Sequence, residues 1–563
     1  MAAMQMNNKK LILIVYFSVI FLLGCNGEGI TSLSERSVIY CAEGSPETFN
    51  PQLVTSGTTI DATSNQLYNR LITFQGKEDT LTPALAKSWH VTKNGKKITF
   101  YLRKDVAFHQ TDYFTPSRNL NADDVIFSFN RILDPKHPYH LVSGGSYPFF
   151  QNIGITKLIE KIEKINEYTV RFHLSHADNS FLANLATDYA IILSAEYAKQ
   201  LTENNVKTNI DTHPIGTGPF KLKEYRVGSL IRFYRHDQYW LKPANIEQLV
   251  FDITPSNTGR LTKLLAKECD VTAYPIAHKK INENENLNLE AVTALNVGYF
   301  GFNVKQPPFD NKLVRKAVSY AINKQALLEA VYQGKAELAI TILPNSSWAF
   351  DKTIAEQEYN PVLAKSLLEV AGFPQGFSMN LWAMPVQRPY NPNAITMAKL
   401  IQADLNQIGI EVKIVSYEWN TFLNRLKLGE HQSFLLGWSA DHPDPDNFFS
   451  PMLSCAASDT GSNTTFWCNK EYDNIIQNAL QTTNLTLRKR YYAQAMKILA
   501  EEIPLIPIAH SKRYQARNEN VSGEILAAFG GINFYSVAKT NLVSKVDTVK
   551  SKNNDTSNNL GEN

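Results

Sequence analysis

Hydrophobic and polar positions along this chain follow two periods, one typical of strands and one typical of helices. Alternation and short apolar runs predict strands at residues 38–41, 98–102, 169–174, 410–415 and 503–508. Apolar residues spaced three and four apart predict helices at residues 122–133, 313–332, 362–371, 394–408 and 487–501. Because strands and helices follow one another throughout, the pattern predicts an α/β fold.

The predicted helix over residues 122–133 has the clearest ends. Asn121 is a suitable N-cap, and Asp123 and Asp124 place carboxylates in the first turn, where they complement the helix dipole. Asp134-Pro135 then ends the helix.

Composition describes an ordinary globular protein of more than one domain. The chain has 563 residues, 44% of them hydrophobic and 19% charged, which suggests two or three domains. Its net charge is only +3, so nothing in the charge balance points to a nucleic-acid partner.

The N-terminus has the pattern of an export signal. Lys9-Lys10 precede an apolar run over residues 11–23, which is too short for a comfortable membrane span of about 20 residues. The run ends in Leu22-Leu23-Gly24-Cys25, which resembles the bacterial lipobox, in which the cysteine is acylated. We therefore expect a signal peptide over residues 1–24, lipidation of Cys25 and a tether over residues 25–37. A plain secretory signal or an uncleaved anchor is the alternative.

Four further cysteines remain, an even number that is typical of disulfides in an exported chain. Cys455 and Cys468 bracket a polar loop that a local bridge would close, which leaves Cys41 to pair with Cys269. A zinc site is the alternative, but the chain has no CxxC pair. At the other end, the polar residues 545–563 predict a disordered tail.

Several blocks of sequence, in a fixed order, carry a family resemblance. They are Leu85–Trp89, Thr99–Arg103, Val106–His109, Asn121–Phe129, Pro214–Phe220 and Val314–Ala317. This order resembles the extracellular solute-binding proteins of the peptide/nickel class, which deliver ligands to ABC importers. The resemblance extends from Val38 to about Tyr535.

Two members of that class are similar to different parts of the chain. Dipeptide-binding proteins are similar at Tyr40–Pro46, Thr55–Thr59, Val142–Tyr147, Leu381–Asn391 and Asn447–Phe449. Sap-type proteins, which are linked to resistance against antimicrobial peptides, are similar at Tyr113–Arg118, Thr258–Leu261 and Phe529–Gly531.

The resemblance implies a periplasmic binding protein-like fold, with two large lobes joined by a hinge and a third, inserted domain. Domain I would combine residues 38–68, 218–296 and 510–540, and the Cys41–Cys269 bridge would lie within it. Domain II would span residues 69–217 and domain III residues 297–509.

The resemblance also implies a ligand site. In dipeptide binders one Asp takes the peptide ammonium and one Arg its carboxylate, and the matching residues are Asp441 and Arg388. Arg suits the carboxylate because its planar fork donates two parallel hydrogen bonds. Matching aromatic and loop positions near the ligand are Trp438, Trp419, Thr55, Ser56 and Gly57.

Other roles are open for these residues. Arg388 could be a surface arginine, and the two tryptophans could belong to the core. The aspartates at 441, 444 and 446 could form a metal loop or cap a helix. Pro214–Phe220 lacks the Lys-Ser/Thr ending of a phosphate loop, so we interpret it as a structural turn.

The chain offers no recognisable catalytic motif, no metal site and no cofactor motif. We therefore predict a periplasmic, lipid-anchored, monomeric receptor that binds short peptides and partners the permease subunits of an ABC importer. A Sap-type receptor for longer cationic peptides or haem is the first alternative. An exported peptidase or peptide chaperone is the second.

Overall fold

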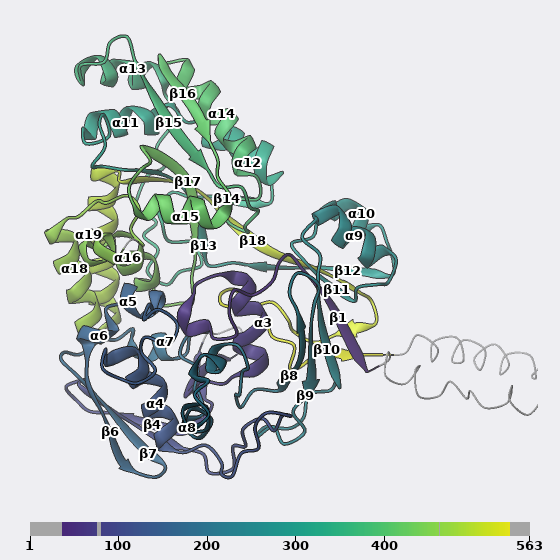
Figure 1. Cartoon of the computed structure of the whole chain (residues 1–563). Coiled ribbons are helices and arrows are strands. Elements are labelled where there is room, and N and C mark those ends of the chain that lie inside the picture. The colour runs from purple at the N-terminus through teal and green to yellow at the C-terminus, as the bar shows by residue number, and fades with distance from the viewer. Residues whose placement is uncertain (1–35, 76–79, 461, 541–563) are drawn as a thin grey trace, which may run out of the picture.

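A computed structural model describes residues 36–75, 80–460 and 462–540, and Figure 1 shows them as an upper and a lower lobe joined through a long mixed sheet. The predicted signal peptide, Cys25 and the predicted tail lie outside the described residues. Within the described ranges, no helix combines the length and the apolar character needed to cross a membrane.

The long sheet runs in the order β16-β15-β17-β13-β18-β11-β1-β10-β9-β8, with β12 and β14 also paired to β18. Its strands are β1 (Ser37–Ala42), β8 (Phe220–Arg226), β9 (Leu230–Arg235), β10 (Gln248–Ile253), β11 (Val271–Ala273), β12 (Leu287–Thr293), β13 (Asn296–Phe302), β14 (Ala336–Leu338), β15 (Phe377–Ala383), β16 (Ile410–Val415), β17 (Ser433–Ser439) and β18 (Leu505–Asn518).

Strand β18 joins the two halves of this sheet. Its first half pairs with β13 and β14, and its second half pairs with β11 and β12. The strand predicted at 503–508 is thus wrong in both bounds, because it starts two residues later and continues to Asn518. Ile503 has a left-handed backbone and ends the preceding helix, so the strand cannot begin there.

The lower lobe is built on a four-stranded sheet, β4-β5-β7-β6, with helix α4 packed on it. The elements of this lobe and of its links are α3 (Gly57–Leu67), β2 (Ile72–Gln75), β3 (Thr80–Pro83), β4 (Ala86–Val91), β5 (Lys97–Leu102), α4 (Ala122–Leu133), α5 (Pro148–Asn152), α6 (Ile155–Leu158), β6 (Ile159–Asn166), β7 (Thr169–Leu174), α7 (Phe181–Leu185) and α8 (Ala195–Glu203).

Helix α4 has the predicted bounds. The Asn121 side chain accepts a hydrogen bond from the Asp123 backbone, and the Asp124 side chain accepts one from the Asn121 backbone, which together form a capping box. Because both bonds are local, the sequence alone was enough to place this helix.

The upper lobe surrounds the other half of the long sheet with helices (Figure 1). They are α11 (Lys312–Ala321), α12 (Lys324–Tyr332), α13 (Pro361–Val370), α14 (Ala394–Asn406), α15 (Trp419–Lys427), α16 (Asp446–Leu453), α17 (Cys455–Thr460), α18 (Lys470–Gln481) and α19 (Leu485–Glu502). Helices α9 (Asn257–Leu265) and α10 (His278–Asn282) flank β11 and β12, and β19 (Val521–Ser522) pairs with β20 (Ala538–Lys539).

The single helix predicted over residues 313–332 is wrong, since the structure forms two helices, α11 and α12, with a break at Ile322-Asn323. The Asn323 side chain caps α12 by accepting from Ala326, while the Asn323 backbone donates to Asp404 of a distant helix. That second bond is a tertiary contact, which the apolar periodicity could not reveal.

The buried apolar residues form two large clusters, one from residues 38–273 and 521–537 and one from residues 295–509. The covalent bridges Cys41–Cys269 and Cys455–Cys468 each lie within one of these two halves, with Cα–Cα distances of 5.9 and 4.5 Å.

The turn at 214–220 packs its backbone on Leu67: a Cβ at Gly216 would lie 2.0 Å from the Leu67 carbonyl oxygen. Glycine is therefore required there for packing.

Candidate functional site

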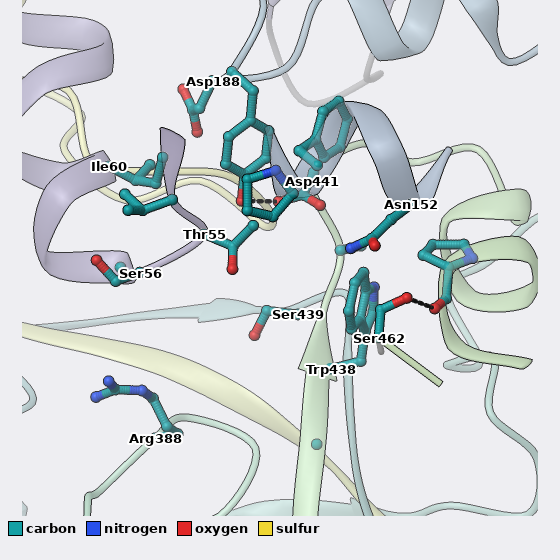
Figure 2. A pocket seen from close by; sticks show the side chains of 18 of the residues that line it. Thr55, Ser56, Ile60, Asn152, Asp188, Arg388, Trp438, Ser439, Asp441 and Ser462 are labelled. Atoms are coloured by element: carbon teal, nitrogen blue, oxygen red, sulfur yellow. Dashed lines mark hydrogen bonds between the residues drawn. The ribbon is translucent and has the colours of Figure 1, made fainter. Parts of the chain in front are cut away.

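A cavity of about 640 Å³ lies between the two lobes, and all seven predicted site residues line it. Thr55, Ser56 and Gly57 enter from the lower half at the start of α3, and the other four come from the upper half. In Figure 2, Arg388 lies at one side of the cavity and Asp441 at another, with Thr55 and Ser439 between them. A separate hollow of about 950 Å³ lies between residues 46–49 and 211–234 and contains none of the seven.

Asp441 follows the end of strand β17, where the chain leaves the sheet. Its backbone donates a hydrogen bond of 3.0 Å to the Asn447 side chain, which also accepts from the Trp438 indole at 3.1 Å. Asn447 thus fixes the two predicted site residues relative to each other. From the opposite lobe, the Tyr189 hydroxyl donates to Asp441 Oδ1 at 3.2 Å.

Among the described residues, no hydrogen-bond partner of Asp441 carries a positive charge. Burial raises the pKa of Asp441 to about 7, and the nearby charge of Asp188 adds to this effect. The hydrogen bond from Tyr189 offsets only part of it, since a hydroxyl carries no charge. A cation placed beside Asp441 would restore the ionised form.

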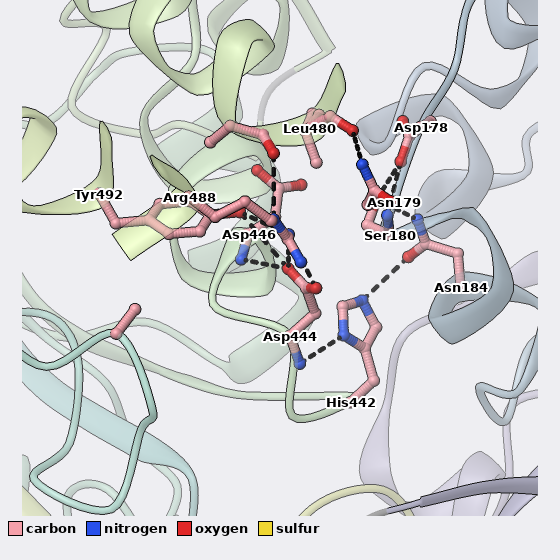
Figure 3. Close-up of polar contacts among 12 residues, drawn as sticks. Asp178, Asn179, Ser180, Asn184, His442, Asp444, Asp446, Leu480, Arg488 and Tyr492 are labelled. Carbon is pink, nitrogen blue, oxygen red and sulfur yellow. Dashed lines mark hydrogen bonds and ion pairs between the residues drawn. The ribbon is translucent and has the colours of Figure 1, made fainter. Parts of the chain in front are cut away.

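Residues immediately after Asp441 are held by polar contacts that Figure 3 shows. His442 Nδ1 accepts from the Asp444 backbone at 3.2 Å, so the Nε2–H of the neutral ring donates to Asn184 Oδ1 at 3.0 Å across the lobe boundary. Burial lowers the pKa of His442 to about 4, which keeps the ring neutral. Arg488 forms an ion pair of 2.9 Å with Asp444.

These contacts show which partners two of the three aspartates have within the fold. Asp444 is used by Arg488, and Asp446 lies in the first turn of α16 and accepts from Ser450. Among the described residues, no cluster of three or more His, Cys, Asp or Glu side chains could hold a metal ion. Asp441 alone of the three lines the cavity.

Arg388 lies in a tight turn between β15 and α14, closed by two backbone hydrogen bonds with Asn391. Its guanidinium lies 5.3 Å from the centre of the Trp419 ring and donates to the Gln387 carbonyl at 3.0 Å. Burial lowers the pKa of Arg388, but the tyrosines at 274 and 390 and the carboxylate of Glu43 more than offset this and raise it overall. The side chain is half-buried and cationic.

Two facing glycines let the turn that carries Arg388 lie flat on the sheet. Gly298 of β13 pairs with Gly437 of β17, and Tyr390 covers both. A Cβ on Gly298 would lie 2.2 Å from the Tyr390 carbonyl oxygen, and a Cβ on Gly437 would lie 2.1 Å from the Tyr390 ring. Tyr332 anchors the same carbonyl with a hydrogen bond of 2.7 Å.

Trp438 and Trp419 are half-buried and line the cavity, while also packing against the upper core. Trp419 stacks on Phe422 with ring centres 5.8 Å apart. Each tryptophan can therefore line the ligand cavity and pack against the core at the same time.

The sequence did not indicate several other residues that line the cavity. They are Asp61, Asp188, Tyr189, Tyr274, Arg513 and the segment Phe529–Gly531. Asp188 pairs with Arg70 at 3.0 Å and accepts from the Gly531 backbone at 2.6 Å, so it ties the C-terminal segment to the lower lobe. In the sequence, Phe529–Gly531 carries only the resemblance to Sap-type proteins, and the other residues belong to no recognisable motif.

Comparison with known families settles the kind of protein. The model of bacterial extracellular solute-binding proteins, family 5, middle region, matches residues 80–460. The chain belongs to this family. Family 5 proteins bind solutes and are not enzymes, and the predicted lobed α/β fold is confirmed by the solved structures of this family.

Three similar proteins are informative for this family 5 member. The dipeptide-binding protein of Escherichia coli (strain K12) is 45% identical over 511 residues, which cover 90% of this chain and 95% of the relative. The peptide transport periplasmic protein SapA of Salmonella typhimurium is 40% identical over 509 residues, or 90% and 92% of the two chains. The dipeptide-binding protein of Pseudoalteromonas sp. SM9913, solved with Met-Leu, has a TM-score of 0.86 at 49% identity and covers 90% of this chain and 100% of its own.

Proposed function

We propose that this protein captures short peptides, dipeptides above all, and delivers them to an ABC importer. Asp441 would bind the peptide ammonium and Arg388 its carboxylate. The observation that carries this proposal is that a carboxylate and a guanidinium line one interlobe cavity while their own hydrogen-bond partners there are neutral.

The remaining predicted residues have supporting roles in this proposal. Trp438 and Trp419 supply apolar walls for the ligand, and Thr55, Ser56 and Gly57 close over it from the lower lobe. Because a closed cleft excludes water, charge-assisted hydrogen bonds discriminate strongly against a ligand that lacks one terminal charge. Recognition of this kind selects for peptide length, because it depends on the distance between the two charged termini.

The three-domain division described above and the hinge belong to the same proposal. Strand β18 and the segment from β12 to β13 connect the two halves of the long sheet, so we place the hinge there. Ligand binding would shift an open–closed equilibrium toward the closed form, which docks on the permease subunits. We further propose a monomer in the periplasm, anchored through a lipid on Cys25.

A Sap-type role is the second candidate, with longer cationic peptides or haem as ligand. The observation that favours it is that Phe529–Gly531, a block of Sap-type likeness, lines the cavity. A ligand held by an internal segment would not need capture of its two termini.

Calorimetric titration of the soluble chain from Ile30 distinguishes the two roles. The ligands are a free dipeptide, its C-terminally amidated form, its N-acetylated form and a long cationic peptide. We expect tight binding of the free dipeptide and loss of binding when either end is blocked. Binding of the long peptide alone would contradict the dipeptide proposal and favour the Sap-type role.

A further inference from the structure

A second cavity, of about 580 Å³, adjoins the ligand cavity at Arg388. Five residues line both cavities and form the boundary between them: Glu47, Ser56, Tyr274, Arg388 and Trp419. In Figure 2, Ser56 and Arg388 lie on the same side of the view, away from Asp441. The second cavity therefore begins at the end of the ligand site that receives the peptide carboxylate in the proposed function.

Four charged side chains line the second cavity: Glu43, Glu47, Arg260 and Arg388. Arg260 is occupied within the fold, because its guanidinium donates to the carbonyl oxygens of Thr254, Pro255 and Ala273 at 2.8–3.0 Å. Arg388 stacks on Trp419 and is committed to the ligand carboxylate in the proposed function. The two glutamates remain as charges that a ligand can meet.

Glu43 is the more informative of the two. It follows strand β1, and its Oε1 atom is buried with no hydrogen-bond partner among the described residues. The positive charges of Arg260 and Arg388 act on the Glu43 carboxylate, but neither side chain forms a hydrogen bond with this oxygen, so a donor from the ligand would satisfy it. Glu47 is exposed and adds negative charge at the same cavity.

We propose that the second cavity holds the side chain of the C-terminal residue of a bound peptide and favours lysine or arginine there. This inference rests on the proposed function, because the carboxylate bound by Arg388 fixes where the last residue lies. Its Cα is one bond from that carboxylate, so its side chain begins at the boundary of the two cavities. A lysine has a flexible four-carbon stem and three donors, which suits an approach to Glu43.

The test compares dipeptides that differ by one ammonium group. Ala-Lys and Ala-norleucine are titrated calorimetrically into the purified full-length protein and into its Glu43→Gln variant. We expect the wild type to bind Ala-Lys about tenfold more tightly than Ala-norleucine, which is the size of one charge-assisted hydrogen bond. In Glu43→Gln the affinity ratio of Ala-Lys to Ala-norleucine should fall to about one.

A reversed pair supplies the control. The affinity ratio of Lys-Ala to norleucine-Ala should be the same in the wild type and in Glu43→Gln, because the charge is then at the Asp441 end. Equal binding of Ala-Lys and Ala-norleucine by the wild type would overturn the inference and leave the dipeptide proposal intact, even if the variant fails to fold. Preference for Ala-Lys that survives in Glu43→Gln would also overturn it. Absence of binding by all four dipeptides would overturn the proposed function and this inference with it.

Discussion

Tyr189 and Asp441 meet across the cavity, where the tyrosine hydroxyl donates a hydrogen bond of 3.2 Å to the carboxylate. The two residues are separated by 252 positions and belong to opposite lobes. Burial raises the pKa of Asp441 to about 7, and the hydrogen bond from the neutral tyrosine offsets only part of that rise. A peptide ammonium would supply the charge that the tyrosine lacks.

Affinity for a dipeptide should fall as the pH is lowered from 7 to 5. With the pKa of Asp441 at about 7 in the free protein, a proton must leave this carboxylate when the ammonium binds. We expect the affinity to decrease about fiftyfold over this range, with proton release upon binding. Titration in two buffers of different ionisation enthalpy measures both quantities. An affinity that is constant between pH 7 and pH 5 would contradict the assignment of Asp441.

Removal of the charge at Asp441 should stabilise the ligand-free protein at high pH. Folding raises the pKa of the Asp441 carboxyl group. Its contribution to stability is therefore fully present below the pKa of the unfolded group, and it is lost as the pH rises through about 7. Asp441→Asn should therefore exceed the wild type in unfolding free energy by about 4 kcal/mol at pH 8, and the two should converge near pH 4. Denaturant unfolding at both pH values measures the difference. The same offset at both pH values would show that the effect is not protonation.

Arg388 should account for the discrimination between a free and an amidated C-terminus. In the wild type, amidation should weaken binding by about 3 kcal/mol, since it removes one partner of a charge pair in a closed site. In Arg388→Gln, amidation should have little further effect, so the two changes should be strongly non-additive. A double-mutant cycle by calorimetry gives the coupling energy. Additive losses would place the carboxylate elsewhere in the cavity.

Local signals explain what the sequence could predict. Helix α4 was bounded correctly because Asn121 and Asp124 form its cap within one turn. The seven site residues came from the family resemblance, and the structure brings all of them to one cavity.

Long-range contacts explain what the sequence could not predict. The break between α11 and α12 depends on Asn323 and on Asp404, which are 81 positions apart. Asp188 reaches the cavity through its contacts with Arg70 and Gly531, which are 118 and 343 positions away. No window of sequence contains such pairs, so residues that function through them carry no local pattern.

The Gly298–Gly437 pair should be required for the position of Arg388. Gly437→Ala places a methyl group 2.1 Å from the Tyr390 ring, so the turn that carries Arg388 must move away from the sheet. We expect a loss of about 1–3 kcal/mol in unfolding free energy, as for overpacking in a core, together with weaker dipeptide binding. Gly57→Ala is the stability control, because its added methyl group would lie 4.0 Å from the Tyr274 hydroxyl. An unchanged unfolding free energy in Gly437→Ala would mean that Tyr390 repacks without cost.

The ion pair between Arg131 and Asp211 should be among the most sensitive points of the lower lobe. The guanidinium of Arg131 is fully buried and donates to both carboxylate oxygens of Asp211, at 2.8 and 2.6 Å. Arg131→Met would leave the Asp211 carboxylate buried without its cation, which typically costs about 3–5 kcal/mol. Denaturant unfolding measures this loss.

Lys164→Met is the matched control, since its ion pair with Asp123 has the same 2.6 Å separation but both side chains are more than 40% exposed. Water already solvates those charges, so the control should lose less than about 1 kcal/mol. Equal losses in the two variants would show that burial does not determine the strength of these pairs.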